Sequence, residues 1–339
     1  MNYLLVARAD DLASRQDRLL YRIFEILPGL LAWGTIALAV MGSWLFPVQT
    51  ALFVIAFVIF WLVRTVYLSF HLKAGYKIMK EHENTDWIAK LEDLPDYTLE
   101  VQDWKDIYHL VVIPAYTEST EILRETLQSV AQSDYDNKRL IVVLGMEERA
   151  GAAAHETAEL MRKEFGDRFF RFLVTFHPDG IEGEVAGKGA NETYAAKKAK
   201  EEILDPAKIP YQNIIFTSLD ADTVIFPKYF SCLSYHYLTA KDPLHTSFQP
   251  IPLFVNNIWE APAISRIFSF SSTFWHTMNQ QRPEKLITFS SHAMSIQALV
   301  DVGFDHPNVV NEDSRIFWQC FLFYNGDYRV QPLFIPVSM

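Results

Sequence analysis

Two aspartates, Asp220 and Asp222, stand directly after an apolar run with only Ala221 between them. The run, residues 214–219, is rich in β-branched residues and is short, which predicts a buried strand. In open α/β sheets ligands bind at the carboxyl ends of the strands. Two carboxylates at such an end supply the hard oxygen ligands that a divalent cation with bound phosphates prefers. The pattern predicts a Mg²⁺ or Mn²⁺ site at Asp220 and Asp222; the alternative is a solvated turn, where Asp is also common.

A second acidic pair, Glu312–Asp313, precedes apolar residues at helical spacing. A carboxylate on the first turn of a helix is placed to take a proton from a reacting hydroxyl, so Asp313 is a candidate general base. The alternative is a helix cap followed by a first-turn acid. Lys188 also stands at the start of a predicted helix, whose N-terminal N–H groups favour anions. It is a candidate partner for phosphates, the alternative being an exposed loop lysine.

Strands and helices alternate from residue 107 onward, which predicts a mainly parallel sheet with helices on both faces. The expected ligand loops follow three of the strands, at residues 114–118, 145–148 and 220–222. The expected strands cover residues 110–113, 140–144, 169–176 and 214–219, and the expected helices cover residues 118–132, 152–165 and 191–203.

No charged residue occurs from Ile26 to Val63, and Pro47 lies near the middle of this stretch. A membrane helix needs about 20 apolar residues, so the stretch predicts two transmembrane helices joined by a tight turn. Arginines precede it and basic residues follow it, whereas the turn has neither Lys nor Arg. The positive-inside rule then places both ends, and the large region after residue 80, in the cytoplasm.

Bulk composition excludes several classes of protein. The chain has 339 residues and a net charge of -11, which argues against a nucleic-acid surface because such surfaces are basic. Its two cysteines, Cys232 and Cys320, are far apart and suit a reducing compartment as core residues. No H-E-x-x-H motif occurs among the 10 histidines, so a zinc hydrolase has no support.

Four motifs in order resemble those of family 2 glycosyltransferases. Residues 112–118, Val-Ile-Pro-Ala-Tyr-Thr-Glu, look like the opening strand and loop, and residues 187–191 resemble the Gly-Lys-x-x-Asn segment. The D-x-D motif corresponds to residues 220–222, and Glu312–Asp313 resembles the Glu-Asp pair that contains the catalytic base. With the preceding hairpin, the resemblance is to the membrane-integrated members of cellulose, chitin and hyaluronan synthase type, and it covers residues 107–336.

The resemblance implies a GT-A fold, a nucleotide-diphosphate sugar donor (UDP- or GDP-linked) and a glycan or lipid-linked acceptor. Single displacement with inversion is the simplest mechanism when base and metal carboxylates are separate. The catalytic candidates are Asp313, Asp222 and Asp220, with Asp222 and Asp220 also as metal ligands. Donor contacts are expected from Pro114, Ala115, Tyr116, Glu118, Glu147, Lys188 and Asp220, and acceptor contacts from Glu312, His292 and Gln249.

Three departures from the family pattern stand out. Thr117 replaces the usual Asn, and the second strand runs into Glu147 where an Asp normally meets the nucleobase. The Q-x-x-R-W motif of processive members is absent from this chain. Either the enzyme is not processive or the chain is a fragment, and we expect a fragment that lacks a C-terminal membrane part.

The expected organisation is a cytoplasmic segment at 1–24, two transmembrane helices at 25–70, a charged connector at 71–106 and a GT-A catalytic domain at 107–339. This arrangement predicts a multi-pass protein of the cell membrane with its catalytic domain in the cytoplasm. Two other classes stay open: a nucleotidyltransferase that makes sugar nucleotides, and a non-catalytic, membrane-tethered protein that binds nucleotide sugars. The hairpin and the lack of a Gly-rich basic loop after the first strand disfavour the former, and retention of Asp220, Asp222 and Asp313 disfavours the latter.

Overall fold

The computed structural model describes residues 6, 8–95, 97, 99, 101, 103–256 and 258–339. The chain divides into two compact units, Met1–His71 and Leu72–Met339. Parts of the predicted N-terminal segment and charged connector, and one residue of the predicted catalytic domain, therefore lie outside the described residues.

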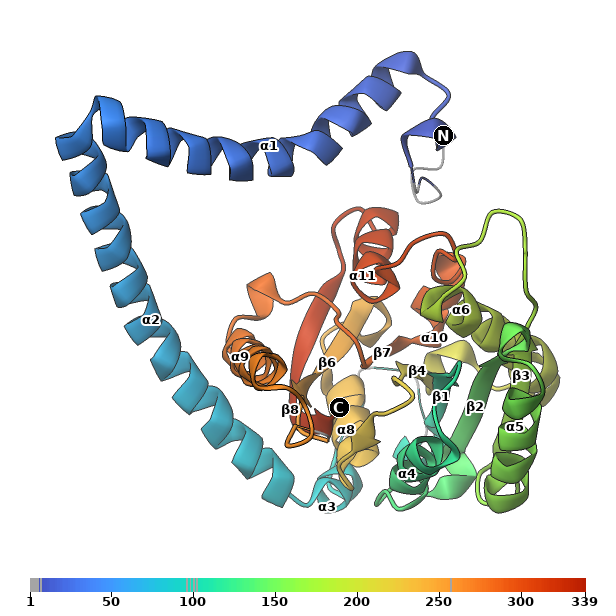
Figure 1. Cartoon of the computed structure of the whole chain (residues 1–339). Coiled ribbons are helices and arrows are strands. Elements are labelled where there is room, and N and C mark those ends of the chain that lie inside the picture. Colours follow the sequence, from blue (N-terminus) through green and yellow to red (C-terminus); the bar gives the residue numbers. More distant parts are fainter. Residues whose placement is uncertain are drawn as a thin grey trace. The chain divides into compact units, whose positions relative to one another are not determined.

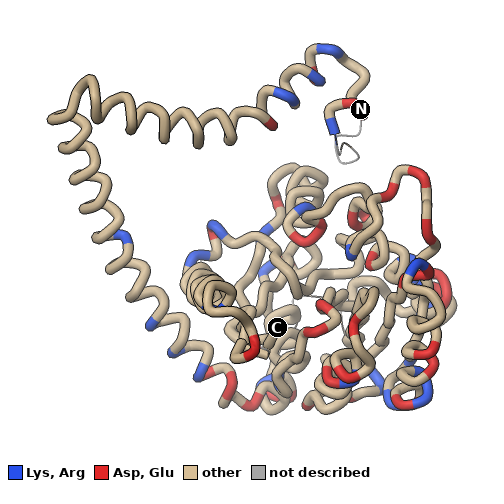
Figure 2. The backbone as a smooth tube through the Cα atoms, viewed as in Figure 1, with Lys and Arg blue, Asp and Glu red and all other residues tan. Residues whose placement is uncertain are grey.

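Two long helices, α1 (Arg15–Leu45) and α2 (Pro47–Asn84), account for most of the first unit. The hydroxyl of Ser14 caps α1 by accepting a hydrogen bond from the backbone N–H of Asp17. Pro47 occupies the first position of α2, where its missing N–H costs nothing. Both helices are long and apolar enough to cross a membrane, and Figure 2 shows their charges confined to the start of α1 and the later part of α2. α1 runs unbroken through residue 25, the expected start of the first membrane span.

The second unit contains the last turns of α2 and all the strands (Figure 1). Its strands are β1 (Tyr108–Pro114), β2 (Leu140–Glu147), β3 (Arg171–His177), β4 (Ile214–Ser218), β5 (Val224–Ile225), β6 (Thr246–Leu253), β7 (His292–Ser295) and β8 (Arg329–Ser338). Its further helices are α3 (Trp87–Glu92), α4 (Thr120–Ala131), α5 (Ala152–Phe165), α6 (Lys188–Ala199), α7 (Asp205–Ala207), α8 (Tyr229–Thr239), α9 (Ala263–Asn279), α10 (Ile296–Asp301) and α11 (Glu312–Phe323), with a π-helix at Lys200–Leu204.

The eight strands form one sheet in the order β3-β2-β1-β4-β7-β6-β8-β5. The strands β3, β2, β1 and β4 are parallel, as the alternating pattern predicts. The prediction of a mainly parallel sheet is only partly correct, because β7 runs antiparallel to both β4 and β6, and β5 runs antiparallel to β8. The sheet is therefore mixed.

Hydrophobic side chains fill both faces of the sheet. Alternate residues of a strand point to opposite faces, and in β1 Val111 and Ile113 belong to one buried cluster while Leu110 and Val112 belong to the other. Helices α3, α4, α5 and α8 cover the first face, and α6, α10 and α11 cover the second (Figure 1). This two-faced burial fixes the register of the strands, so the polar residues that follow β1, β2 and β4 emerge together at one edge.

Candidate active site

One cavity of about 410 Å³ lies at the carboxyl ends of β1, β2 and β4. All eight predicted donor and metal residues line it: Pro114, Ala115, Tyr116, Glu118, Glu147, Lys188, Asp220 and Asp222. Ile122, Arg149, Asn191 and Ala221 complete the lining. The loops after β1, β2 and β4 and the first turn of α6 thus bring their polar side chains to one volume.

The loops after β1 and β2 meet through Arg149, which the sequence analysis missed. Its guanidinium forms a two-point ion pair with the buried Glu147 and lies 4.3 Å from the ring centroid of Tyr116. The carboxylate of Glu118 accepts a hydrogen bond of 2.6 Å from the backbone N–H of Tyr116, which fixes that loop. Tyr116 is 39% exposed and offers an aromatic face on which a nucleobase could stack. The sequence offered one signal for Arg149: this basic residue stands only two positions after Glu147, a predicted donor residue.

Asn191 holds these two strand ends together from α6. Its side-chain amide donates hydrogen bonds to the carbonyl oxygens of Ala115 (3.3 Å) and Gly145 (2.7 Å). A Cβ at residue 145 would lie 2.7 Å from the amide oxygen of Asn191, so only glycine permits this close approach. The Asn of the Gly-Lys-x-x-Asn segment therefore has a positioning role in the architecture of the cavity.

The two aspartates after β4 differ in their surroundings. Asp220 Oδ1 lies 2.7 Å from Lys188 Nζ, and its other oxygen accepts a hydrogen bond from the hydroxyl of Ser290. Burial opposes the charge of Asp220, but Lys188 and Ser290 outweigh it and lower the pKa of this carboxyl. Burial, followed by repulsion from Asp220, instead raises the pKa of Asp222. A cation next to Asp222 would relieve that repulsion, which makes Asp222 the better placed of the two for metal binding.

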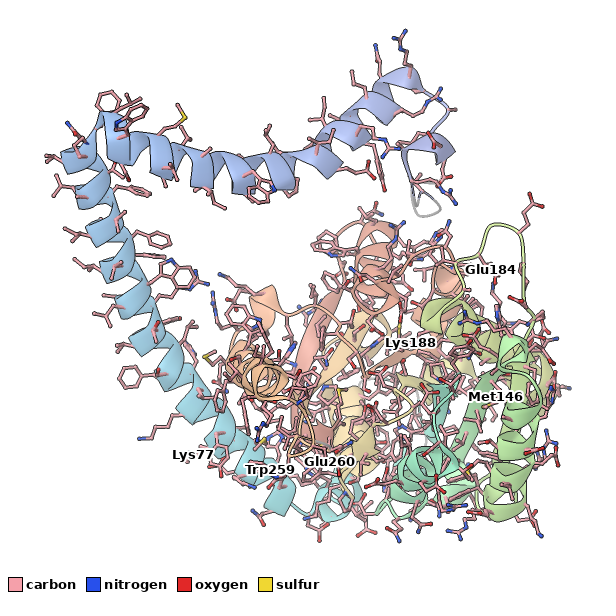
Figure 3. The ribbon with its side chains drawn as sticks, viewed as in Figure 1. Lys77, Met146, Glu184, Lys188, Trp259 and Glu260 are labelled. Atoms are coloured by element: carbon pink, nitrogen blue, oxygen red, sulfur yellow. The ribbon has the colours of Figure 1, made fainter. Side chains whose placement is uncertain are left out.

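The first turns of α6 and α11 meet beside the cavity. A Cβ at Gly189 in α6 would lie 2.9 Å from the Cβ of Glu312, the first residue of α11, so glycine lets the two helices approach. Lys188, labelled in Figure 3, spans the junction. Its Nζ lies 2.9 Å from Asp313 Oδ1 and 3.6 Å from Glu312 Oε1, in addition to its contact with Asp220. One ammonium group therefore connects the D-x-D motif with the candidate base.

Two further buried acids lie near this ammonium group. Glu192 is 1% exposed and Asp305 is 5% exposed. Burial raises the pKa of Glu192 well above its usual value, and burial with the charges of Asp313 and Glu312 raises the pKa of Asp305 to about 7. Burial opposes a charged Lys188, but Asp220, Glu192 and Asp313 outweigh it and raise the pKa of this lysine. The site is strongly acidic and favours bound cations.

The loop before β7 closes the site behind Asp220. Ser290 has a φ of 48°, in the left-handed region that a serine adopts at a cost of about 1–2 kcal/mol. In that conformation the hydroxyl of Ser290 donates a hydrogen bond to the carboxylate of Asp220. The hydroxyl of the neighbouring Ser291 accepts a hydrogen bond of 3.3 Å from the backbone N–H of Asp220. Strained residues gather at functional sites, where the surrounding structure holds them. This loop therefore orients the D-x-D turn.

The predicted acceptor residues lie around the same loop and do not line the cavity. Gln249, within β6, is 1% exposed, and its amide bonds the backbone of Phe289 and Ser291. His292 is 2% exposed, and its Nδ1 donates to the carbonyl oxygen of Ser290 at 2.9 Å. Glu312 and Asp313 reach the cavity edge through Lys188. Gln249 and His292 are thus placed to support the loop from within.

Comparisons with known proteins give one family match and several similar solved structures. The family described as chitin synthase matches residues 86–163, which include β1, β2 and their loops. A search of curated proteins finds no match. Similar solved structures include a mannosyltransferase from Pyrobaculum calidifontis in complex with GDP-Man and Mn²⁺, with 14% identity, a TM-score of 0.47, and coverage of 82% of this chain and 67% of that chain. TarS 1–349 of S. aureus has 15% identity and a TM-score of 0.42, over 67% of this chain and 58% of that chain.

A second TarS 1–349 structure, in complex with UDP-GlcNAc, has 14% identity and a TM-score of 0.43, over 69% of this chain and 59% of that chain. This chain therefore spans less than two thirds of the length of these two TarS structures. The chitin synthase match over residues 86–163 confirms the resemblance to family 2 glycosyltransferases that the motifs predict.

Proposed function

We propose that this chain is a membrane-attached, metal-dependent, inverting glycosyltransferase. It transfers a hexose from a UDP- or GDP-linked donor to a polysaccharide or polyprenyl-lipid acceptor at the cytoplasmic face of the cell membrane. The observation that carries the proposal is the convergence of three motifs on Lys188, whose Nζ lies within 3 Å of both Asp220 (2.7 Å) and Asp313 (2.9 Å). Lys188 lines the donor cavity and also contacts the candidate base, so the two parts of the site lie next to each other.

The residues present fit a divalent cation with bound phosphates. Asp222 lines the cavity with a carboxyl whose pKa burial and Asp220 raise, so a cation there would offset a local excess of negative charge. Asp222, with Asp220 beside it, would hold Mg²⁺ or Mn²⁺, which would neutralise the departing diphosphate as a Lewis acid. Lys188 and the N–H groups that open α6 provide further positive charge for the same phosphates.

The chain's own groups then account for the transfer. Arg149 and Tyr116 would hold the nucleoside end, the former through its charge and the latter by stacking. Lys188 fixes Oδ1 of Asp313, and the other carboxylate oxygen of Asp313 would accept the proton of the acceptor hydroxyl. The acceptor oxygen forms its bond to the anomeric carbon as the bond to the β-phosphate oxygen breaks, and the electron pair leaves with the nucleoside diphosphate. Attack opposite the leaving group inverts the anomeric configuration.

Membrane attachment rests on α1 and α2, which have the length and composition of membrane spans. In the second unit α9 also exposes a row of large apolar side chains, among them Ile264, Ile267 and Phe268. An exposed apolar helix face of this kind suits the headgroup boundary of a bilayer.

The proposal is tested with Asp222→Asn in the full chain, purified in detergent. Binding of UDP and GDP is measured by calorimetry with and without Mn²⁺, and donor-sugar transfer is measured in membranes that contain the chain. We expect nucleotide binding to depend on Mn²⁺ in the wild type and to weaken in Asp222→Asn, with transfer lost. Asp301→Asn, at the exposed end of α10, is the control. Unchanged metal-dependent binding in Asp222→Asn would show that this carboxylate is not a ligand.

A further inference from the structure

A group of metal-ligand side chains lies outside the donor cavity, where the last turn of α2 meets α8. His82 comes from α2, and Cys232 and His236 come from α8. One ligand atom of each residue lies within 4.8 Å of the others. Cys232 and His236 are four residues apart and therefore project from the same face of α8. None of the three lines the donor cavity.

One ring nitrogen of each histidine lacks a partner. His82 Nδ1 and His236 Nε2 are both buried and make no hydrogen bond. A buried ring nitrogen without a partner costs free energy comparable to a lost hydrogen bond, and two such histidines beside one thiol call for an explanation. Each of these nitrogens can present a lone pair to a metal ion, depending on the tautomer of its ring.

The other nitrogen of His236 has the partner expected for a metal ligand. Its Nδ1 lies 3.1 Å from the side-chain amide nitrogen of Gln331 in β8. A half-turn of this amide exchanges its nitrogen and oxygen; Nδ1 then donates the hydrogen bond and Nε2 carries the free lone pair, which is the arrangement that we expect when a metal ion binds. Metal-binding histidines are commonly oriented in this way by a second residue. Trp87 packs against both rings, with centroid distances of 4.9 Å to His82 and 5.4 Å to His236.

The ligand types of the group suit a borderline-soft cation, because zinc is bound by imidazole nitrogen and cysteine sulfur.

We propose that His82, Cys232 and His236 bind a zinc ion that fastens the end of α2 to α8. Zinc prefers nitrogen and sulfur ligands at about 2.0–2.3 Å, which places them about 3.5 Å apart in a tetrahedron. The ligand atoms lie within 4.8 Å of one another, so small side-chain rotations bring them to that spacing. On binding, the Cys232 S–H bond breaks, its proton passes to solvent, and the thiolate sulfur bonds the ion. A water molecule completes the fourth position.

The test uses the full chain in detergent, first stripped with a chelator and then titrated with Zn²⁺ or Co²⁺. We expect about one equivalent of tightly bound zinc per chain. The cobalt form should show the near-ultraviolet thiolate charge-transfer band and the visible bands of a tetrahedral site. A wild-type protein that binds neither metal here, or a cobalt form without the thiolate band, would overturn the proposal.

Variants then assign the ligands. Cys232→Ser should abolish the thiolate band, and His236→Gln should weaken zinc binding by roughly 100-fold or more. Gln331→Met, which touches no metal, should weaken binding by roughly 10-fold through the orientation of His236. Cys320→Ser is the matched control, because it removes the chain's other buried cysteine. A thiolate band that survives Cys232→Ser but disappears in Cys320→Ser would refute the assignment.

Discussion

Replacing Lys188 with Met removes the positive charge shared by Asp220, Asp313 and Glu312. Its Nζ lies 2.7, 2.9 and 3.6 Å from these carboxylates, respectively. Stripping one partner from a fully buried ion pair costs about 3–5 kcal/mol. The side chains of Lys188, Asp220 and Asp313 are 27%, 28% and 23% exposed, so solvent screens part of their attraction. We therefore expect the free energy of unfolding to fall by about 2–3 kcal/mol. The melting midpoint should then fall by about 5–10 °C.

The two native cysteines make the assay specific for the second unit. Cys232 and Cys320 are the chain's only cysteines, and both are buried in that unit. A thiol-reactive dye added during heating therefore reports its unfolding and is insensitive to α1. Lys198→Met is the control, because Lys198 lies on the same helix and its described contacts are with the exposed Glu201 and, at 5.9 Å, the ring of Tyr194.

Two conditions sharpen this prediction. Mn²⁺ should raise the midpoint of Lys188→Met more than that of the wild type, because a cation can replace the missing charge. The pKa of Asp220 is lowered in the folded state, so its contribution is present above about pH 4 and is lost as the pH falls through the lowered value. The difference between wild type and variant should therefore shrink in acid. A Lys188→Met protein that melts like the wild type at pH 7 would refute the electrostatic reasoning.

Three further predictions concern other parts of the chain. Arg149→Met should weaken UDP or GDP binding by roughly 10-fold in calorimetry, since it removes one charge-assisted contact. It should also lower the melting midpoint, because it leaves the buried Glu147 without its ion-pair partner; unchanged affinity would exclude Arg149 from the donor site. Asp305 has a pKa raised to about 7, so its ionisation lowers wild-type stability as the pH rises from about 4 to 7. The stability gained in Asp305→Asn should be larger at pH 8 than at pH 5, and the same gain at both values would contradict this. Single cysteines introduced at Asn2 and at Lys105 should both be labelled from the cytoplasm, and labelling of either from outside would refute the hairpin.

The local parts of the fold follow from the sequence. The strand before Asp220, the helix that starts at Glu312, and the alternation from residue 107 onward depend on short-range patterns of apolar residues and helix starts. The structure has each of them. Residues 152–165 even match α5 at both ends. The carboxyl-end rule for parallel strands predicted the three loops at the cavity, and the family resemblance supplied the residues expected there, eight of which line it.

The remaining features depend on contacts between distant residues. The antiparallel pairing of β4 with β7 joins Ile215 to Ser295, and nothing local to either strand encodes that direction. Lys188 meets Asp313 across 125 positions of sequence. The left-handed Ser290 likewise requires the assembled loops, because its hydroxyl bonds Asp220 across 70 positions of sequence. Sequence patterns specify elements and their order, whereas side-chain partners follow from tertiary packing.

In the proposed reaction Asp313 acts as the general base, and the donor site does not need it for binding. Asp313→Asn keeps the size and position of the side chain but cannot accept a proton usefully at neutral pH. Glu312→Gln is its matched partner, because neighbouring helix residues point about 100° apart and cannot share one role.

The decisive measurement compares donor affinity and sugar transfer in these two variants, in the same membranes and with Mn²⁺ present. For Asp313→Asn we expect nearly unchanged nucleotide-sugar affinity and a transfer rate lower by about 10²–10⁴-fold. For Glu312→Gln we expect transfer to persist. Normal transfer by Asp313→Asn, with or without loss in Glu312→Gln, would contradict the assignment of Asp313 as the base.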